Sequence, residues 1–380
     1  MDQITEHKLN TTGRLAALII LLLLEAVFLF IMIALDVLPM KYMLALLAVL
    51  ALVDAGGIVL LRSKRRGRQI AGIVLCFIMC VLLCIGTAMM YKTFQSLGKI
   101  SGAKELPKSE QTVVTQNPFN VCVTGIDMWG DIDQVSRSDV NMIVTVNPKT
   151  RTIMLTSVPR DSYVVLHSFG EYDKLTHTGV WGVDETVATI EDWLGIDINY
   201  YVRVDFSMLV DIVNAIDGID VYSDYAFESA IHDCSYKKGW NHLDGKEALY
   251  FARERKAFED EDQQRIINQQ KVMKAILKKV SSSKVLLTNY TKLLDAVDDE
   301  MQTDMSQKEI TSLVKMQLND MSSWTIKTQT VKGDLEMRGT YTMGMGRDLL
   351  VSIPRENSVE KVKEGIDMTL HPENYSEEEE

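Results

Sequence analysis

Two aspartates and two arginines near the ends of short apolar runs are the residues best suited to chemistry. Asp127 follows the run 119–123, Arg137 and Asp139 precede the run 140–146, and Arg160 follows the run 152–158. Two carboxylates brought together repel unless a cation lies between them, and Mg²⁺ prefers one or two protein carboxylates, water and phosphate oxygens. The pair Asp127 and Asp139 therefore predicts a Mg²⁺ site, with an ordinary Asp-containing turn as the alternative.

Arginines supply the second half of the predicted site. They come from separate segments of the chain: Arg137, Arg160, Arg253, Arg255 and Arg265. A guanidinium binds phosphate oxygens through parallel hydrogen bonds, worth roughly 1.5–3 kcal/mol each for charged partners, so this set suits a pyrophosphate. The alternative for Arg253 and Arg255 is a solvated helix face in the charged stretch 253–262, which spacing alone favours.

Strands and helices must position these side chains. β-Branched runs bounded by Asn, Pro and Gly predict strands at 119–123, 140–146, 152–158, 162–166 and 200–204. Apolar residues at helical spacing predict helices at 184–194, 206–216, 245–252 and 265–280. Strands alternating with helices indicate an α/β fold, a three-layer α/β/α domain, and open sheets of this kind bind ligands at the ends of their strands. We expect residues 119–280 to form the core of this domain.

The C-terminal part carries weaker signals. Residues 281–370 are expected to complete the same domain, with helices at 286–297 and 310–318, a strand at 324–331 and a glycine-rich loop at 333–346. The chain ends in an acidic tail, 371–380, whose last residues, 376–380, are expected to be disordered.

Composition shifts sharply near residue 92, because the sequence before it is mostly apolar. Within residues 1–91, runs at about 15–35, 42–61 and 70–91 predict three transmembrane helices, the first about 31 Å long and able to cross a bilayer. The basic loop 62–68 is expected in the cytoplasm, so everything after residue 92 lies outside the cell. Residues 92–118 are expected to form a polar linker.

Glu25 and Asp54 stand near the middle of two apolar runs, where a charge is costly. A hydrogen bond between helices or to a partner chain is favoured over a proton or ion pathway, and the sequence leaves both readings open.

The motifs around these residues resemble the LytR-CpsA-Psr (LCP) family. They are Gly125-Ile126-Asp127, Arg137-Ser138-Asp139, Pro159-Arg160-Asp161, Arg253-Glu254-Arg255 and Asp262-Gln263-Gln264-Arg265. The resemblance covers about residues 115–280, and the preceding membrane helices are similar to the capsular-polysaccharide (CpsA-like) branch. Two positions depart from the common family pattern, because Trp129 and Asn268 stand where an arginine is often found.

The resemblance implies a Mg²⁺-dependent phosphotransferase in the cell membrane of a Gram-positive bacterium. Such an enzyme binds a polyprenyl-pyrophosphate-linked glycan, capsular or teichoic-acid-like, and moves the glycan phosphate onto a peptidoglycan acceptor. It implies Asp127 and Asp139 as metal ligands and an apolar tunnel for the lipid tail. The substrate phosphates would be bound by Arg137, Arg160, Arg253, Arg255, Arg265 and Gln269. Capsule-assembly membrane proteins are a further class of partner.

Asp161 and Asp262 are the remaining acidic candidates of the catalytic site. Either could orient an arginine or accept a proton from an attacking hydroxyl, and orientation is the safer assignment. His177 has no Ser or Cys pattern around it, so direct attack by an acceptor hydroxyl is favoured over a nucleophilic triad.

Two other functions use the same residues. With water as the acceptor, the site would be a polyprenyl-pyrophosphate pyrophosphatase. A membrane regulator or polysaccharide-binding factor is the non-enzymatic alternative, although the predicted cytoplasmic parts leave no room for a DNA-binding domain. The net charge of −12 gives no support for a nucleic-acid partner.

Overall fold

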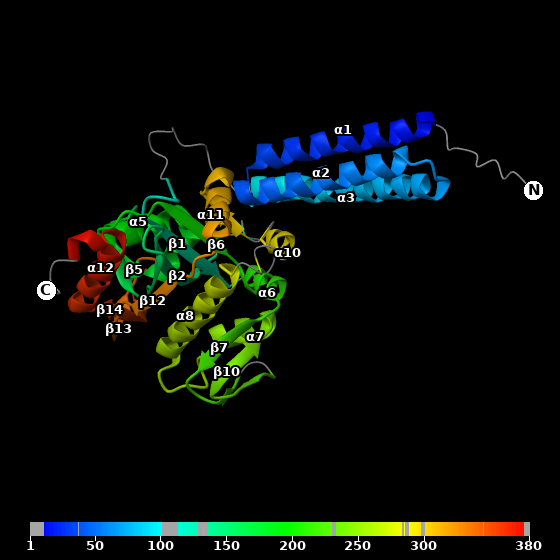
Figure 1. The fold of residues 1–380 in the computed structure, drawn as a ribbon. Helices are drawn as coiled ribbons and strands as arrows, with labels where there is room; N and C mark the ends of the chain where they lie inside the picture. Colours follow the sequence, from blue (N-terminus) through cyan, green and yellow to red (C-terminus); the bar gives the residue numbers. More distant parts are fainter. Residues whose placement is uncertain are drawn as a thin grey trace, which may run out of the picture. The chain divides into compact units, whose positions relative to one another are not determined.

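The computed structural model describes residues 11–36, 38–100, 113–127, 132, 136–229, 233–282, 285, 289–297, 301–344 and 346–375. The chain divides into two compact units, residues 1–95 with 314–320, and residues 96–313 with 321–380. The first unit contains three long apolar helices, and the second contains the central sheet (Figure 1).

The apolar N-terminal region folds as three helices, α1 (Thr11–Leu35), α2 (Met40–Arg62) and α3 (Arg66–Ile100). Each is long and apolar enough to cross a membrane, in agreement with the three predicted helices. Helix α3 continues through residues 92–100, which were expected to belong to the linker, because Lys92, Gln95 and Leu97 are good helix formers and no proline interrupts them. The rest of that linker up to residue 112 lies outside the described residues.

A six-stranded mixed sheet forms the centre of the second unit. Its strands are, in spatial order, β11 (Met301–Thr303), β6 (Tyr200–Val204), β1 (Phe119–Ile126), β2 (Ser138–Asn147), β3 (Thr152–Ser157) and β12 (Thr325–Thr330). Strands β1 and β6 are parallel, as are β3 and β12, whereas β2 is antiparallel to both β1 and β3. The C-terminal ends of β1, β3, β6 and β12 therefore meet the start of β2 at one edge of the sheet, which we call the carboxyl edge.

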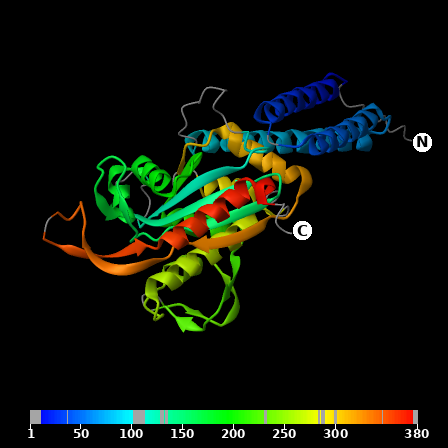
Figure 2. The ribbon, with the colours of Figure 1, turned by 90° about the vertical axis from the view of Figure 1, so that its left-hand side faces the viewer.

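Helices cover both faces of the sheet. Because strand side chains alternate, Cys122 and Ile143 pack on one face in a core shared with α5 (Val183–Leu194) and α12 (Glu356–Leu370). Val121, Val123 and Met142 pack on the other face in a core shared with α8 (Glu261–Val280) and the first half of α11 (Gln307–Asp320). Figure 2 shows α12 lying along the sheet. The predicted three-layer α/β/α arrangement is confirmed.

A third core lies beyond α8. It joins α8 to α6 (Phe206–Ala215), α7 (Gly245–Arg253) and the paired strands β7 (Ile219–Ser223) and β10 (Gly239–Leu243). Helix α6 begins at Asp205, whose side chain accepts a hydrogen bond from the Met208 amide. Helix α7 begins with a capping box formed by Asp244 and Glu247. These caps determine where the two helices start.

Shorter elements connect the layers. They are β4 (Tyr163–Val165), β5 (Tyr172–Lys174), α4 (Leu175–Thr178), the 3₁₀ helix η1 (Gly179–Trp181), β8 (Phe227–Glu228), β9 (Ser235–Tyr236), α10 (Tyr290–Asp295) and the 3₁₀ helix η2 (Pro372–Tyr375). Residues 286–288, at the start of a predicted helix, and 376–380, the end of the acidic tail, lie outside the described residues.

The prediction of a glycine-rich loop at 333–346 is wrong for the first half of that segment. Residues Gly333–Gly339 form strand β13, which pairs antiparallel with β14 (Asp348–Pro354), and the hairpin projects beyond the sheet (Figure 2). A Cβ atom at Gly333 would lie 2.6 Å from the Ile353 carbonyl oxygen. The glycine is therefore required by close strand pairing and does not mark a loop.

Candidate active site

The carboxyl edge of the sheet collects the predicted site residues from separate segments. Asp127 follows β1, Asp139 is the second residue of β2, and Arg160 follows β3. Ile126 pairs with Ser138 across an irregularity in the β1–β2 register. Asp127 and Asp139 therefore stand at the adjacent ends of neighbouring strands, as the position of the motifs in the sequence suggested.

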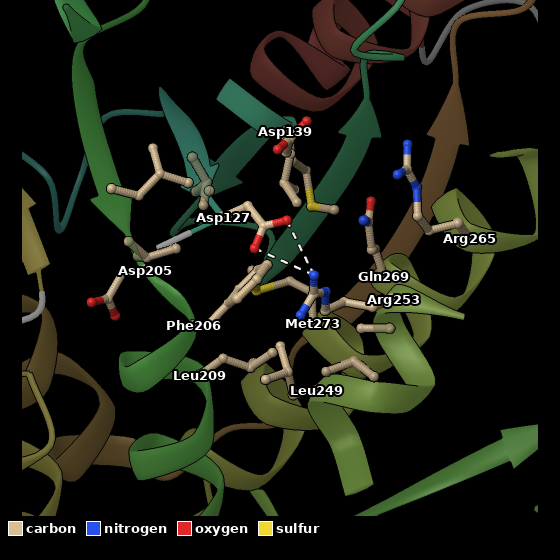
Figure 3. A pocket seen from close by; sticks show the side chains of 18 of the residues that line it. Asp127, Asp139, Asp205, Phe206, Leu209, Leu249, Arg253, Arg265, Gln269 and Met273 are labelled. Atoms are coloured by element: carbon tan, nitrogen blue, oxygen red, sulfur yellow. Dashed lines mark hydrogen bonds and ion pairs between the residues drawn. The ribbon is translucent and has the colours of Figure 1, made fainter. Parts of the chain in front are cut away.

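Both aspartates line one cavity of about 240 Å³, shown in Figure 3. Its charged end carries Asp127, Asp139, Arg160, Arg253, Arg255 and Arg265, together with Gln269. The rest of the wall is largely apolar and comes from the sheet and from helices α6, α7 and α8. It includes Val123, Met142, Phe206, Leu209, Leu249, Val272, Met273 and Ile276. One cavity thus joins a cluster of charges to an apolar interior.

Each of the two predicted metal ligands is paired with an arginine. A carboxylate oxygen of Asp127 lies 3.1 Å from Nη2 of Arg253, whose guanidinium also lies 4.2 Å from the centre of the Phe206 ring. Asp139 accepts a hydrogen bond of 2.7 Å from Arg160. These contacts hold both carboxylates at the cavity wall and compensate their charge.

Asp161 and Asp262 hold arginines and do not themselves line the cavity. Asp161 lies 2.7 Å from Nζ of Lys174 and 3.6 Å from Nε of Arg160. Although burial alone would raise the pKa of Asp161, the hydrogen bond from Lys174 and the nearby positive charges lower it. Asp262 lies 3.3 Å from Arg265 and 3.8 Å from Arg255.

Two arginine N–H groups of the site are buried without a hydrogen-bond partner among the described residues. They are Nε of Arg160 and Nε of Arg265. Burial, followed by the positive charge of Arg160, lowers the pKa of Arg265. For Arg160, the hydrogen bond and charge of Asp139 outweigh burial and raise the pKa. A buried donor that makes no hydrogen bond is costly, and an anion bound between these arginines would satisfy both.

Most of the predicted site residues come together, and a few do not. Asp127, Asp139, Arg160, Arg253, Arg255, Arg265 and Gln269 line the same cavity. Arg137 is exposed and does not line the cavity. Asn268 is buried and donates to the Phe251 carbonyl, so its place in the sequence motif reflects packing. Trp129 lies outside the described residues.

The donor set at the carboxyl edge fits Mg²⁺. Within the described ranges, no group of three or more His, Cys, Asp or Glu side chains is arranged to hold a metal. Mg²⁺ requires fewer protein ligands, because water and phosphate oxygens complete its shell. Asp127 and Asp139, on one cavity wall, are a suitable pair, provided that Arg253 and Arg160 release them.

Sequence reasoning considered Lys174 as a possible anion contact but expected it to be exposed, and it assigned no role to Thr176. A loop lysine is usually exposed, but Lys174 ends β5 with a side chain only 14% exposed. The Thr176 hydroxyl lies 3.5 Å from the Asp139 carboxylate. Only the pairing of β4 with β5, which aligns Tyr163 with Lys174, brings this segment to Asp161, and no local pattern announces that pairing.

Comparison with known proteins identifies the family. The model of the LytR_cpsA_psr family matches residues 87–357. The chain is 32% identical over 245 residues to the polyisoprenyl-teichoic acid–peptidoglycan teichoic acid transferase TagU of Bacillus cereus, covering 62% of this chain and 79% of that protein. This name agrees with the class of enzyme that the sequence motifs implied.

Solved structures share the fold. The crystal structure of B. subtilis TagV matches with a TM-score of 0.54 and 29% identity, over 67% of this chain and 98% of that chain. A structure of TagT bound to LI-WTA matches with a TM-score of 0.54 and 26% identity, over 72% and 97% of the two chains. The family match spans most of the chain and the expected motifs stand together at one cavity, so this protein belongs to the LytR_cpsA_psr family.

Proposed function

We propose that this chain transfers a glycopolymer phosphate from a polyprenyl-pyrophosphate carrier to peptidoglycan. The observation that carries the proposal is the composition of the cavity, because buried guanidinium N–H groups that make no hydrogen bond to the described residues adjoin an apolar interior. A lipid pyrophosphate has the matching chemistry, with anionic oxygens at one end and an isoprenoid tail at the other. The names of TagU relatives, which are teichoic acid transferases to peptidoglycan, support the same reaction.

In the reaction, a peptidoglycan oxygen replaces the polyprenyl phosphate on the phosphorus next to the glycan. The oxygen of a peptidoglycan hydroxyl forms a bond to the phosphorus next to the glycan, while the bond from that phosphorus to the bridging oxygen breaks. The electron pair leaves with the polyprenyl phosphate, and the proton of the hydroxyl passes to solvent or to a base. Negative charge gathers on the transferred phosphoryl group and the leaving phosphate, where positive groups lower the barrier.

Arg160, Arg253, Arg255 and Arg265 are the groups that we assign to this stabilisation. Asp161 is a poor general base, because its lowered pKa disfavours proton uptake at neutral pH. We therefore assign Asp161 and Asp262 to positioning: Asp161 holds Arg160 and Lys174, and Asp262 holds Arg255 and Arg265. Gln269 adds an amide donor at the cavity wall.

We further propose that Asp127 and Asp139 hold Mg²⁺ when the lipid pyrophosphate is bound. A bound Mg²⁺ supplies Lewis acidity toward the phosphate oxygens. The partners of the two carboxylates support this assignment, since Arg253 and Arg160 are themselves phosphate-binding candidates. Exchange of arginine–carboxylate pairs for arginine–phosphate pairs would free both aspartates without leaving a charge uncompensated.

The location of the reaction follows from the basic loop between α2 and α3. Lys64 and Arg65 in the loop, together with Arg62 at the end of α2 and Arg66 and Arg68 at the start of α3, concentrate positive charge there, and the positive-inside rule assigns such a connection to the cytoplasm. We propose a multi-pass membrane protein whose sheet domain faces the exterior of a Gram-positive cell, where peptidoglycan is found.

Transfer by the purified full-length chain tests the proposal. With Mg²⁺, a glycan-bearing polyprenyl pyrophosphate and peptidoglycan fragments, we expect a new phosphodiester that mass spectrometry detects. Arg160→Ala and Arg265→Ala should each lower the rate by roughly ten- to a hundredfold, because each removes a charged phosphate contact of about 1.5–3 kcal/mol. Arg355→Ala is the matched control, since Arg355 pairs with Asp334 on the surface outside the cavity lining.

Other outcomes identify the alternatives. If the donor is consumed and only free glycan phosphate appears, the chain is a pyrophosphatase. If the donor binds and is never consumed with any acceptor, the regulatory or polysaccharide-binding role replaces the enzyme.

A further inference from the structure

Three aromatic rings form an exposed cluster outside the cavity. The ring centres of Phe169 and Trp181 are 4.7 Å apart, those of Phe169 and Tyr341 are 5.0 Å apart, and those of Trp181 and Tyr341 are 6.1 Å apart. The three residues are 36%, 39% and 46% exposed. We call them the aromatic platform. Large aromatic side chains gathered at a surface mark binding sites more often than isolated ones do.

The platform is built from distant segments that a buried network holds together. Phe169 lies in the turn between β4 and β5, Trp181 ends η1, and Tyr341 follows β13. The Tyr341 amide donates to the Tyr172 carbonyl at 3.0 Å. The next residue, Thr342, donates from its amide to Asp173 at 2.8 Å, and the fully buried Asp173 is also paired with His177 at 2.6 Å.

The same network reaches the active site. Lys174, next to Asp173, pairs with Asp161, and Thr176, next to His177, contacts Asp139. A Cβ atom at Gly179 would lie 2.5 Å from the Ser136 carbonyl oxygen, so η1 begins directly against the segment that leads into β2. Trp181 follows Thr176 by five residues of α4 and η1, and rises of about 1.5–2 Å per residue keep it within about 10 Å of Thr176 along the chain.

The elements that precede Phe169 and Trp181 in the chain pack on the face of the sheet opposite to the apolar cavity. Val164 of β4 and Leu175 of α4 pack into the core that includes α5 and α12, whereas the cavity is lined by residues of α6, α7 and α8. Figure 1 shows α5 and β5 on one side of the sheet and α6 and α8 on the other. The charged residues of the carboxyl edge lie between the two.

We propose that the aromatic platform binds the glycan strand of the peptidoglycan acceptor. The proposal rests on the function proposed above. Pyranose rings carry flat C–H faces that pack against aromatic rings, and that contact buries apolar area while the sugar hydroxyls stay in water. A separation of up to about 10 Å between Trp181 and Thr176, which contacts Asp139, leaves room for one or two sugar rings between the platform and the phosphate.

The geometry of in-line attack indicates that the ligand of the platform is the acceptor glycan and not the donor glycan. The polyprenyl phosphate leaves toward the apolar cavity, which takes its tail. The attacking oxygen must then approach the phosphorus from the opposite side, and β4 and α4, which lead to Phe169 and Trp181, pack on that side of the sheet. The donor glycan is attached to an oxygen that is neither attacking nor leaving, so it does not have to follow this line.

Binding measurements on the full-length chain in detergent test this assignment without relying on turnover. Calorimetry would use three probes: a peptidoglycan tetrasaccharide, a short polyprenyl pyrophosphate without glycan, and the same lipid with glycan. Trp181→Ala and Tyr341→Ala should each weaken tetrasaccharide binding by about three- to tenfold and leave both lipids unchanged. Trp181→Phe keeps a ring and should retain most of the affinity.

Trp240→Ala is the matched control, because Trp240 is a 63% exposed aromatic residue on β10 outside the platform. Wild-type affinity for the tetrasaccharide in both Trp181→Ala and Tyr341→Ala would overturn the proposal, as would a wild-type chain that does not bind the tetrasaccharide. Weaker binding of the glycan-bearing lipid alone would assign the platform to the donor and overturn the acceptor reading. A wild-type chain that binds all three probes and transfers nothing would contradict the proposed function. The assignment of the platform as a glycan-binding site would then still hold.

Discussion

At the scale of residues, the active site is a set of charges that compensate one another until a ligand enters. Asp127, Asp139, Asp161 and Asp262 each contact a cationic side chain. Arg160 and Arg265 nevertheless each keep a buried Nε–H that makes no hydrogen bond within the described part of the chain. The ion pairs within the site therefore leave some guanidinium N–H groups able to bind an anion. The site can bind phosphate in this way while each of the four carboxylates remains paired with a cation.

The predicted metal pair can be tested at this scale. Calorimetry with a short polyprenyl pyrophosphate should show that Mg²⁺ strengthens binding. Changing both Asp127 and Asp139 to Asn should remove that dependence, because the amide keeps the shape of each side chain but not its charge. Asp334→Asn serves as the control, since Asp334 is a surface partner of Arg355. Unchanged Mg²⁺ dependence in a folded double variant would assign the metal to other ligands.

At the scale of elements, helices α6 and α7 pack closely against each other and both line the cavity. A Cβ atom at Gly245, the first residue of α7, would lie 2.2 Å from the Val210 carbonyl oxygen of α6. Leu209 of α6 and Leu249, Ala252 and Arg253 of α7 line the cavity, and Figure 3 shows Leu209, Leu249 and Arg253 around it. The close contact at Gly245 therefore helps to fix the position of α7, which contributes Leu249 to the apolar wall and Arg253 to the charged end of the cavity.

Gly245→Ala should push the two helices apart. Overpacking of this kind costs about 1–3 kcal/mol, so hydrogen exchange of the α6 and α7 amides should become faster and the affinity for a short polyprenyl pyrophosphate should fall. Gly98→Ala is the matched control, because a Cβ at Gly98 meets nothing within 4 Å. Wild-type exchange rates in Gly245→Ala would show that the helices can shift without cost.

At the scale of the whole molecule, the chain consists of a helical unit with membrane-length helices and a sheet unit with the active site. A lipid-linked substrate has its tail in the bilayer, so an enzyme that carries its own membrane helices meets this substrate at high local concentration. The function therefore depends on which side of the membrane the sheet unit occupies.

Cysteine labelling in intact cells measures the topology. In a variant with Cys122 and Cys234 replaced by Ala, Glu360→Cys should react with a membrane-impermeant thiol reagent, because Glu360 is exposed on α12. Lys64→Cys, in the basic loop between α2 and α3, should react only after lysis. The reverse pattern would contradict an exterior active site and the proposed acceptor.

The sequence by itself determined the features that depend on local pattern. Apolar length predicted the three helices α1, α2 and α3, and β-branched runs predicted β1, β2, β3 and β6, with Asp127, Asp139 and Arg160 at one edge of the sheet. Charged residues at strand ends can be predicted from the sequence, because the direction and the order of the strands constrain which strand ends lie at the same edge of the sheet. Motif order also identified the family, which the comparison confirmed.

Only the tertiary structure decided which charges pair and where the apolar surface opens. The partnership of Lys174 with Asp161, the exposure of Arg137 and the cavity beside α6 and α7 depend on contacts between segments far apart in the chain. The strand pair β13–β14 was missed for the same reason, because Gly333 of β13 is required by the close approach of β14. Local residue preferences cannot predict such contacts, because the contacts contribute free energy only when the elements pack together.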